Sequence, residues 1–330
     1  MSALTKTIKL NSGAIIPAVG FGTASADSDT FPLAVKAAVL SGYRHIDTAW
    51  YYKTEKMIGT VLSQLLKSDQ VKRSELFITS KVWPNYWDAP EESLEMSLSD
   101  LQIDYVDMLL QHWPICFAKH EVEEPVFDTN ADLSAIEKIG TRKERDSIPE
   151  VDGKFDYAKD GDYLITYKKI LALRETGKVK TVGVSNFTVE MLERIIKETG
   201  VTPAVNQVEL HPQLPQLELY EYCSSKGIVL EAYSPFGSTG APVLKLPPVT
   251  ELAEKYNVTP GDIVVNYCLT KNIIILPRTV NPERVKKGYK LIELTKEDIT
   301  KLEDYGVEHP SRYIVNDWAK SIGFDRWYLN

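Results

Sequence analysis

Four side chains between positions 47 and 112 have the types needed to give a proton to a carbonyl oxygen: Asp47, Tyr52, Lys81 and His112. A free tyrosine has a pKa near ~10, so it is a weak acid at pH 7. A lysine ammonium beside the phenol lowers that pKa, and an aspartate keeps the ammonium charged and aimed. Histidine can hydrogen-bond the substrate oxygen and orient the carbonyl. We therefore expect a proton relay centred on Tyr52, with carbonyl reduction as its chemistry.

Each of these residues also has an ordinary structural explanation when it is taken alone. Asp47 suits a loop cap, Lys81 a surface lysine with a buried stem, and Tyr52 is one of 17 tyrosines. His112 suits a core histidine satisfied by hydrogen bonds. Their placement at or near the ends of predicted strands favours the catalytic interpretation, because parallel strands bring such ends together.

Short apolar runs alternate with segments of helical periodicity along most of the chain. This alternation predicts eight strand and helix pairs, which match a (β/α)8 TIM barrel better than an open doubly wound sheet. No G-x-G-x-x-G sequence is present; the closest string, Gly20 to Ser25, lacks the third small residue. The predicted strands are Ala18–Gly22, His45–Ala49, Leu76–Val82, Val106–Trp113, Thr181–Asn186, Ala204–Leu210, Val229–Ser234 and Ile273–Pro277.

Local signals define several further elements within what we expect to be one domain, 1–330. Residues 7–16 predict an N-terminal β-hairpin with a turn at 11–13, which in a barrel could close the bottom. A helix rich in leucine is expected after Asp88 and Pro90, with a cap at that start, and another begins at Thr259-Pro260 and runs to about Thr270. The segment Ile115–Gly161, after the fourth strand, is expected to be a long loop over the catalytic face, and the tail after Gly306 is a second loop.

Composition narrows the class of protein. The chain has 330 residues, 43% of them hydrophobic, and a formal charge of −8 with no basic stripe, which argues against a nucleic-acid partner. No run approaches the ~18 apolar residues of a membrane span, and no signal peptide is recognisable. Three scattered cysteines and five histidines without ligand spacing argue against disulfides and metal sites. We expect a cytoplasmic protein without a bound metal, a monomer or homodimer.

The segment from Gly42 to Gly59, with Arg44, Asp47, Tyr52 and Glu55 at fixed spacing, resembles the first motif of the aldo-keto reductases. Two more motifs follow in the family's order, Lys180–Phe187 and Leu276–Thr279 ending at Arg284. Features such as Glu231–Pro235 are similar to the fungal glycerol dehydrogenase and carbonyl reductase branch. The resemblance implies an NADPH-dependent oxidoreductase that reduces aldehydes and ketones, with Tyr52 as its proton donor.

The resemblance also implies a cofactor site. Ser185, Asn186 and Gln207 match the residues that hold the nicotinamide carboxamide, and Tyr233 matches the ring that stacks on it. Ser234 to Ser238, including Phe236, match the loop over the pyrophosphate. Gly22, Thr23 and Asp47 are assigned to the cofactor as well.

The choice of cofactor depends on a cluster near the C-terminal end of the match: Arg278, Thr279, Asn281 and Arg284. Two guanidinium groups can hold the 2′-phosphate that distinguishes NADPH from NADH. Arg278 stands where many members have lysine, and Gly288 where many have asparagine, so use of NADH stays open.

The substrate pocket is expected to include Ala24, Tyr51, Trp83 and Trp113. Many family members have tryptophan at the position of Ala24, so we expect a wider mouth that admits bulkier ketones beside small aldoses, glyceraldehyde and α-keto esters. In the family the C-terminal tail covers the pocket. The tail here contains the aromatic residues Tyr313, Trp318, Phe324, Trp327 and Tyr328.

Two alternatives remain open. A cofactor-sensing binding module can retain the same motifs with little turnover, and oxidation of NADPH with a panel of aldehydes distinguishes it from an enzyme. A hydrolase on the same barrel is disfavoured, because no G-x-S-x-G sequence is present.

Overall fold

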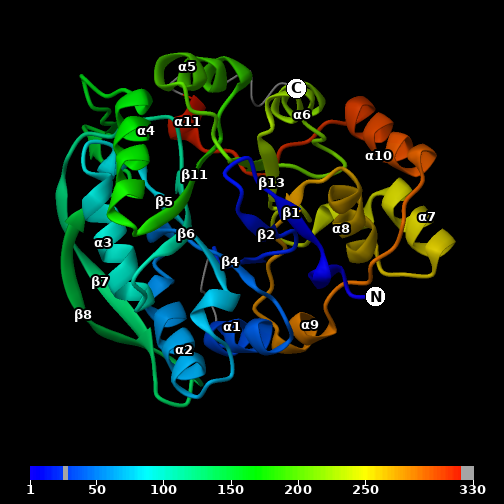
Figure 1. The fold of residues 1–330 in the computed structure, drawn as a ribbon, viewed down its shortest axis with the longest axis horizontal. Helices are drawn as coiled ribbons and strands as arrows, with labels where there is room; N and C mark the ends of the chain where they lie inside the picture. Colours follow the sequence, from blue (N-terminus) through cyan, green and yellow to red (C-terminus); the bar gives the residue numbers. More distant parts are fainter. Residues whose placement is uncertain (25–28, 321–330) are drawn as a thin grey trace. The chain divides into compact units, whose positions relative to one another are not determined.

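The computed structural model describes residues 1–24 and 29–320 (Figure 1). Backbone contacts divide the chain into two compact units. Unit 1 consists of Met1–Gly20, Val205–Pro277 and the chain from Gly288 onward, and unit 2 consists of Phe21–Ala204 and Arg278–Lys287. The single domain expected from the sequence stays a prediction.

Unit 2 contains a parallel sheet with the strand order β11-β6-β5-β4-β3. Strand β5 is buried along its whole length, as expected for a strand covered on both faces. The strands are β3 (Phe21–Gly22), β4 (His45–Asp47), β5 (Phe77–Val82), β6 (Val106–Gln111) and β11 (Val179–Ser185). The helices between and after them are α1 (Phe31–Leu40), α2 (Glu55–Lys67), α3 (Pro90–Leu101), α4 (Tyr163–Ala172), α5 (Val189–Thr199) and α9 (Pro282–Lys287).

Unit 1 contains the other three parallel strands, paired in the order β12-β13-β14. They are β12 (Val205–Glu209), β13 (Val229–Tyr233) and β14 (Ile274–Ile275). The predicted N-terminal hairpin is confirmed as β1 (Thr7–Lys9) paired with β2 (Ile15–Pro17). The helices are α6 (Leu217–Lys226), α7 (Pro247–Tyr256), α8 (Pro260–Thr270), α10 (Lys296–Glu308) and α11 (Asp317–Lys320).

All eight predicted strands are present, several of them shorter than expected. The predicted start of α8 is confirmed, because Thr259 and Asp262 form a reciprocal capping box. Helix α3 begins at Pro90 as expected, but the expected cap from Asp88 is wrong. The Asp88 carboxylate pairs with Arg145 instead.

The segment Ile115–Gly161 differs most from its prediction, because it contains strands where a loop was expected. Strands β7 (Glu121–Thr129) and β8 (Ile136–Arg145) form an antiparallel hairpin, and β9 (Glu150–Val151) pairs with β10 (Lys154–Phe155). The long hairpin lies beside α2 and α3 (Figure 1), where Asp128 accepts a hydrogen bond from Thr60 and Arg142 pairs with Asp100. Its many charged residues hide the alternating pattern by which strands are recognised.

A buried carboxylate holds the chain after α10. Glu209, the last residue of β12, accepts backbone hydrogen bonds from Tyr313 at 2.7 Å and Ile314 at 3.0 Å. The side chains of Arg312 and His211 also lie against it. These contacts fix the first part of the tail within unit 1, whereas Phe324, Trp327 and Tyr328 lie outside the described residues.

The described residues also show the state of the cysteines, the lengths of the helices and the grouping of possible metal ligands. Cys116, Cys223 and Cys268 are buried and free. Among the described residues, no helix is long and apolar enough to cross a membrane. Within the same residues, no group of acidic, cysteine and histidine side chains could hold a metal ion.

Helices α2 and α3 pack so closely that one position accepts only glycine. A β-carbon built on Gly59 would lie 2.0 Å from the carbonyl oxygen of Asp100 and 2.7 Å from the carbonyl carbon of Leu101. Backbone atoms cannot move aside as a flexible side chain can. Gly59 therefore sets the distance between the two helices that follow β4 and β5.

We expect Gly59→Ala to destabilise the protein by about 1–3 kcal/mol, although alanine forms helices better than glycine. Urea unfolding measures the change, and Ser63→Ala on the same helix is the control. An unchanged or higher unfolding free energy for Gly59→Ala would contradict the close approach.

Candidate active site

The four predicted catalytic residues meet in unit 2 around the buried ammonium of Lys81. Lys81 Nζ donates to Asp47 Oδ1 at 2.7 Å, to the carbonyl oxygen of Thr48 at 2.9 Å and to Tyr52 Oη at 3.1 Å. The Lys81 side chain is 0% exposed and that of Asp47 is 4% exposed. All three donor positions of the ammonium thus have a partner, which is what a buried charge requires.

Parallel strand register explains why these residues meet. Asp47 is the last residue of β4 and stands opposite Thr79, two residues before Lys81 in β5. A period of two places Thr79 and Lys81 on the same side of the sheet. Tyr52 follows in a short 3-10 turn, Trp50–Tyr52 (η2), which ends at Lys53 in the left-handed conformation with φ 56°.

Burial opposes the positive charge of Lys81, but Asp47 and Tyr52 outweigh that effect and raise its pKa. The ammonium therefore stays charged throughout the neutral range. A permanent positive charge 3.1 Å from the Tyr52 oxygen favours the phenolate over the phenol.

The strand β6 ends at Gln111, earlier than expected, so His112 lies one residue beyond it and not within it. The backbone N–H of His112 donates to the carbonyl of Val82 at 3.0 Å. Its ring stands nearly perpendicular to those of Tyr52 and Trp83, with centroids 5.7 and 4.8 Å away. Burial, and secondarily the charge of Lys81, lower the pKa of His112 well below its usual range. The imidazole is neutral at pH 7, so it can donate a hydrogen bond without being an acid.

Two of the predicted substrate residues form an aromatic pair beside His112. The rings of Tyr51 and Trp83 are stacked with centroids 3.6 Å apart and an interplanar angle of 4°. Trp83 Nε1 donates to the carbonyl of Ser147 at 2.6 Å, which fixes the indole ring. Trp113 is buried, and Ala24 is half-buried.

Some of the predicted cofactor residues lie next to this cluster in unit 2. Asn186 has a left-handed backbone, with φ 65°, and its side-chain amide donates to the carbonyl of His112 at 3.0 Å and to Ser185 Oγ at 3.0 Å. Thr23, which follows Gly22, donates its N–H and its hydroxyl to the carbonyl of Asp47. The ends of β3, β4 and β11 therefore carry the residues expected to contact a cofactor.

The basic cluster lies at the start of α9. Arg278 donates to the carbonyl of Ala24, and both Arg278 and Arg284 are exposed. The Asn281 side chain accepts from the N–H groups of Glu283 and Arg284, so it caps the helix. The backbone N–H of Asn281 donates to Thr279 Oγ1 at 3.2 Å.

The remaining predicted cofactor residues belong to unit 1. Gln207 is buried in β12 and donates to Glu231 Oε2 at 2.8 Å. Tyr233 ends β13, and Ser234 has a left-handed φ of 47°. Phe236 is half-buried and Ser238 is exposed. Their roles toward a cofactor stay predictions.

Sequence reasoning assigned no role to two buried groups near Lys81, the carbonyl of Thr48 and the side chain of Glu55, although Glu55 belongs to the first motif. The carbonyl of Thr48 accepts a hydrogen bond from the ammonium, and a backbone oxygen leaves no sign in residue type. Glu55 is buried at the start of α2, where Ser80 donates to it at 2.6 Å. Burial raises the pKa of Glu55 to about 7, and Ser80 and Ser97 reduce the shift.

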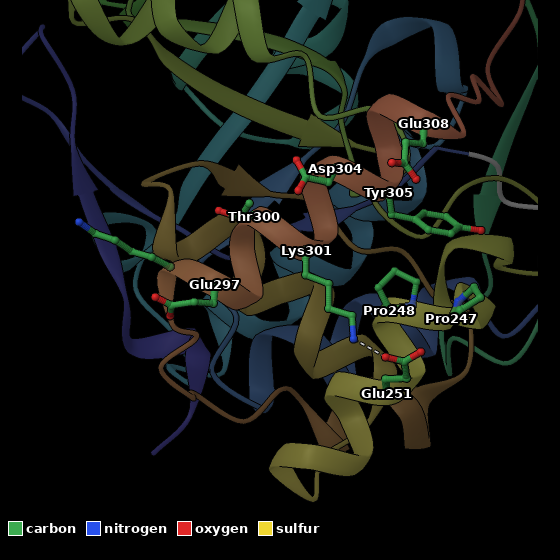
Figure 2. Close-up of a pocket in the computed structure, with 10 residues that line it drawn as sticks. Pro247, Pro248, Glu251, Glu297, Thr300, Lys301, Asp304, Tyr305 and Glu308 are labelled. Carbon is green, nitrogen blue, oxygen red and sulfur yellow. Dashed lines mark hydrogen bonds and ion pairs between the residues drawn. The ribbon is translucent and has the colours of Figure 1, made fainter.

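A separate groove of about 600 Å³ lies between α7 and α10 in unit 1 (Figure 2). Pro247, Pro248 and Tyr305 form its apolar part, and Lys301 pairs with Glu251. None of the predicted catalytic or cofactor residues lines it. The groove is therefore separate from the residues around Lys81 that could carry out chemistry.

The family model described as "Aldo/keto reductase family" matches residues 18–306. The chain belongs to the aldo/keto reductase family. It is 38% identical to a glycerol 2-dehydrogenase (NADP(+)) of Saccharomyces cerevisiae, over 96% of each chain. An aldehyde reductase of the same yeast is 36% identical, over 94% of each chain. Both are fungal, as the sequence features indicated.

A solved aldo-keto reductase of Bombyx mori, in complex with NADP, resembles the structure with a TM-score of 0.78 at 30% identity. The match covers 96% of this chain and 97% of the silkworm protein. The predicted family and the (β/α)8 fold are thereby confirmed.

The buried Glu55 gives a test based on pH. In the unfolded chain a glutamate titrates near ~4.3, so between about pH 4.5 and pH 7 the folded state binds more protons. The free energy of unfolding therefore decreases as pH rises through this window. We expect Glu55→Gln to remove this pH dependence of the unfolding free energy. Between pH 4.5 and 7.5 the unfolding free energy of wild type should therefore fall by on the order of 3 kcal/mol relative to that of the variant.

Urea unfolding at several pH values measures the difference, and Glu254→Gln, at an exposed position of α7, is the control. A constant difference between wild type and Glu55→Gln across this range would show that Glu55 is not buried as a neutral acid.

Proposed function

We propose that this protein is an NADPH-dependent reductase of aldehydes and ketones. The observation that carries the proposal is the set of hydrogen bonds from Lys81 Nζ to Asp47, Thr48 and Tyr52. A buried lysine with a raised pKa beside a phenol is a costly arrangement, and such groups concentrate at functional sites. The aldo/keto reductase family supports the same reaction class.

In the proposed reaction, Tyr52 gives its proton to the carbonyl oxygen as negative charge develops there. Lys81 stabilises the remaining phenolate, and Asp47 keeps the ammonium aimed at the phenol. The neutral imidazole of His112 donates a hydrogen bond that orients the carbonyl. NADPH, when bound, supplies the hydride. The Tyr51 and Trp83 rings flank this position and exclude water.

The residues present are chemically suited to hold NADPH. Ser185 and Asn186 offer a hydroxyl and an amide beside His112, which suit a carboxamide. The exposed Arg278 and Arg284 are the guanidinium groups that a 2′-phosphate requires. The yeast glycerol 2-dehydrogenase (NADP(+)) and the silkworm reductase in complex with NADP agree with this choice. By family resemblance we extend the cofactor site to Gln207 and to 233–238.

The substrate class is proposed more broadly than the reaction. The names of two relatives, glycerol 2-dehydrogenase and aldehyde reductase, support small polar carbonyls such as glyceraldehyde and aldoses as substrates of this protein. The alanine at position 24, where many family members have tryptophan, adds bulkier ketones and α-keto esters. Both groups of substrates belong in one test panel.

We expect Tyr52→Phe to lower kcat for every carbonyl by at least about 10²-fold, since general acid catalysis contributes ~10²–10⁴-fold. The change removes only the hydroxyl, so the Kd for NADPH stays nearly unchanged. NADPH oxidation at 340 nm and cofactor fluorescence measure the two quantities.

Tyr305→Phe, which removes a hydroxyl in the separate groove of unit 1, is the control. Substantial turnover by Tyr52→Phe would mean that another group gives the proton. Tight NADPH binding by wild type without turnover on any substrate would instead favour the cofactor-sensing module.

Position 24 gives a test of substrate size. We expect Ala24→Trp to raise KM for bulky ketones and α-keto esters more than KM for glyceraldehyde, because the larger ring narrows the mouth of the pocket. The ratio of kcat/KM between the two groups of substrates is the measurement, and Ala24→Ser, with little added volume, is the control. An equal effect on small and bulky substrates would contradict the wider mouth.

A further inference from the structure

Residues 144–147, at the end of β8 and just beyond it, contact two turns, of which one carries Tyr51 and Tyr52 and the other directly follows Trp83. We call them the 144–147 segment. One turn is η2, which contains Tyr51 and Tyr52, and the other is the turn Pro84–Tyr86 (η4), which follows Trp83. All of these residues belong to unit 2.

The first contact is an ion pair next to the proton donor. Lys53 directly follows Tyr52, and its ammonium lies 3.7 Å from the centroid of the Trp50 ring and pairs with the carboxylate of Glu144. The Glu144 side chain is only 2% exposed, whereas that of Lys53 is 31% exposed. Arg142 lies on the other side of Glu144, at 2.6 Å. A buried carboxylate thus fixes the residue that ends the Tyr52 turn.

The second contact fixes the aromatic wall. Trp83 Nε1 donates to the carbonyl of Ser147 at 2.6 Å. The Asn85 amide donates to the carbonyls of Arg145 and Asp146, at 2.9 and 3.0 Å. Arg145 returns a hydrogen bond to the carbonyl of Asn85 at 2.7 Å. The indole held in this way is the one that stacks on Tyr51 and faces the His112 ring.

The two contacts are linked through Tyr86. Its ring packs edge-on against Trp50 at 5.1 Å, and the guanidinium of Arg145 lies 4.7 Å from its centroid. Arg145 is almost fully buried and pairs with Asp88 and Glu92 of unit 2. The 144–147 segment therefore fixes the positions of η2 and η4 relative to each other.

We propose that Glu144 is a positioning residue for Tyr52, acting through Lys53, and that the β7–β8 hairpin serves to bring it there. The inference rests on the proposed function and goes beyond it, because it assigns a role to a segment outside the catalytic set. Removal of the Glu144 charge leaves Arg142 paired with Asp100, at 3.0 and 3.1 Å. Lys53 alone loses its ionic partner, so the effect falls on the Tyr52 turn.

The expected effect is on the chemical step. A displacement of about 1 Å in a reacting group can cost ~10²-fold in rate. Lys53 and Glu144 do not belong to the predicted cofactor residues, so binding of NADPH does not depend on them. A change in position of Tyr52 therefore lowers kcat and leaves the affinity for NADPH intact.

The test compares Glu144→Gln with Glu137→Gln, which makes the same change at an exposed position of the same strand. We expect Glu144→Gln to lower kcat about 10- to 100-fold, with the Kd for NADPH within about twofold of wild type and a single cooperative unfolding transition. Glu137→Gln should keep the wild-type kcat. A folded Glu144→Gln with wild-type kcat, or a fall in kcat equal to that of Glu137→Gln, would overturn the inference.

Lys53→Met supplies a second variant at a partly exposed position, together with the double variant. If Glu144 acts through Lys53, the double variant has nearly the same kcat as the worse single variant. Multiplied effects of the two changes would show that they act independently and would refute the proposal. If wild type turns over none of the carbonyls, the proposed function is refuted, and this inference with it. If wild type is active and Glu144→Gln has the same kcat, only this inference is refuted.

Discussion

The hydrogen bonding of the buried Lys81 ammonium is the interaction on which the rest of the proposed active site depends. A charge in the interior is tolerated only if its donors are satisfied and a counter-charge is near. Here a carboxylate, a backbone carbonyl and a phenol satisfy it. These partners come from the end of β4, the next residue and the turn beyond it. The backbone between β4 and α2 must therefore place three hydrogen-bond acceptors around the ammonium of Lys81 on β5.

That constraint extends outward through tightly packed neighbours. Gly59 lets α2 approach α3 until their backbones nearly touch, which fixes the helix that begins just after the Tyr52 turn. Glu55, at the start of α2, lies close enough to the ammonium for Lys81 to lower its pKa, although burial dominates and raises it. The neutral His112 follows from the same surroundings, because burial and the nearby charge both disfavour a second cation.

The β7–β8 hairpin after β6 contributes charged and polar contacts to the turns near Tyr52 and Trp83. Its end joins the turn after β4 to the turn after β5 through Glu144, Arg145 and the carbonyl of Ser147. Charged residues with little exposure are costly unless they are paired, and each of these has partners in the structure. The segment that departs most from its sequence-based prediction thus contacts Lys53, next to Tyr52, and Trp83, whose ring faces His112.

The sequence by itself determined the order of the eight parallel strands, the capped start of α8 and the meeting of Asp47, Tyr52, Lys81 and His112. Strands buried on both faces leave continuous apolar runs, and parallel strands bring the residues at their ends together. Only the tertiary structure decided that Asp88 pairs with Arg145 and does not cap α3, and that 121–145 is a hairpin. It also decided that Glu144 is buried beside the Tyr52 turn. Ion pairs between residues far apart in sequence leave no local periodic pattern, so they become visible only when the chain is folded.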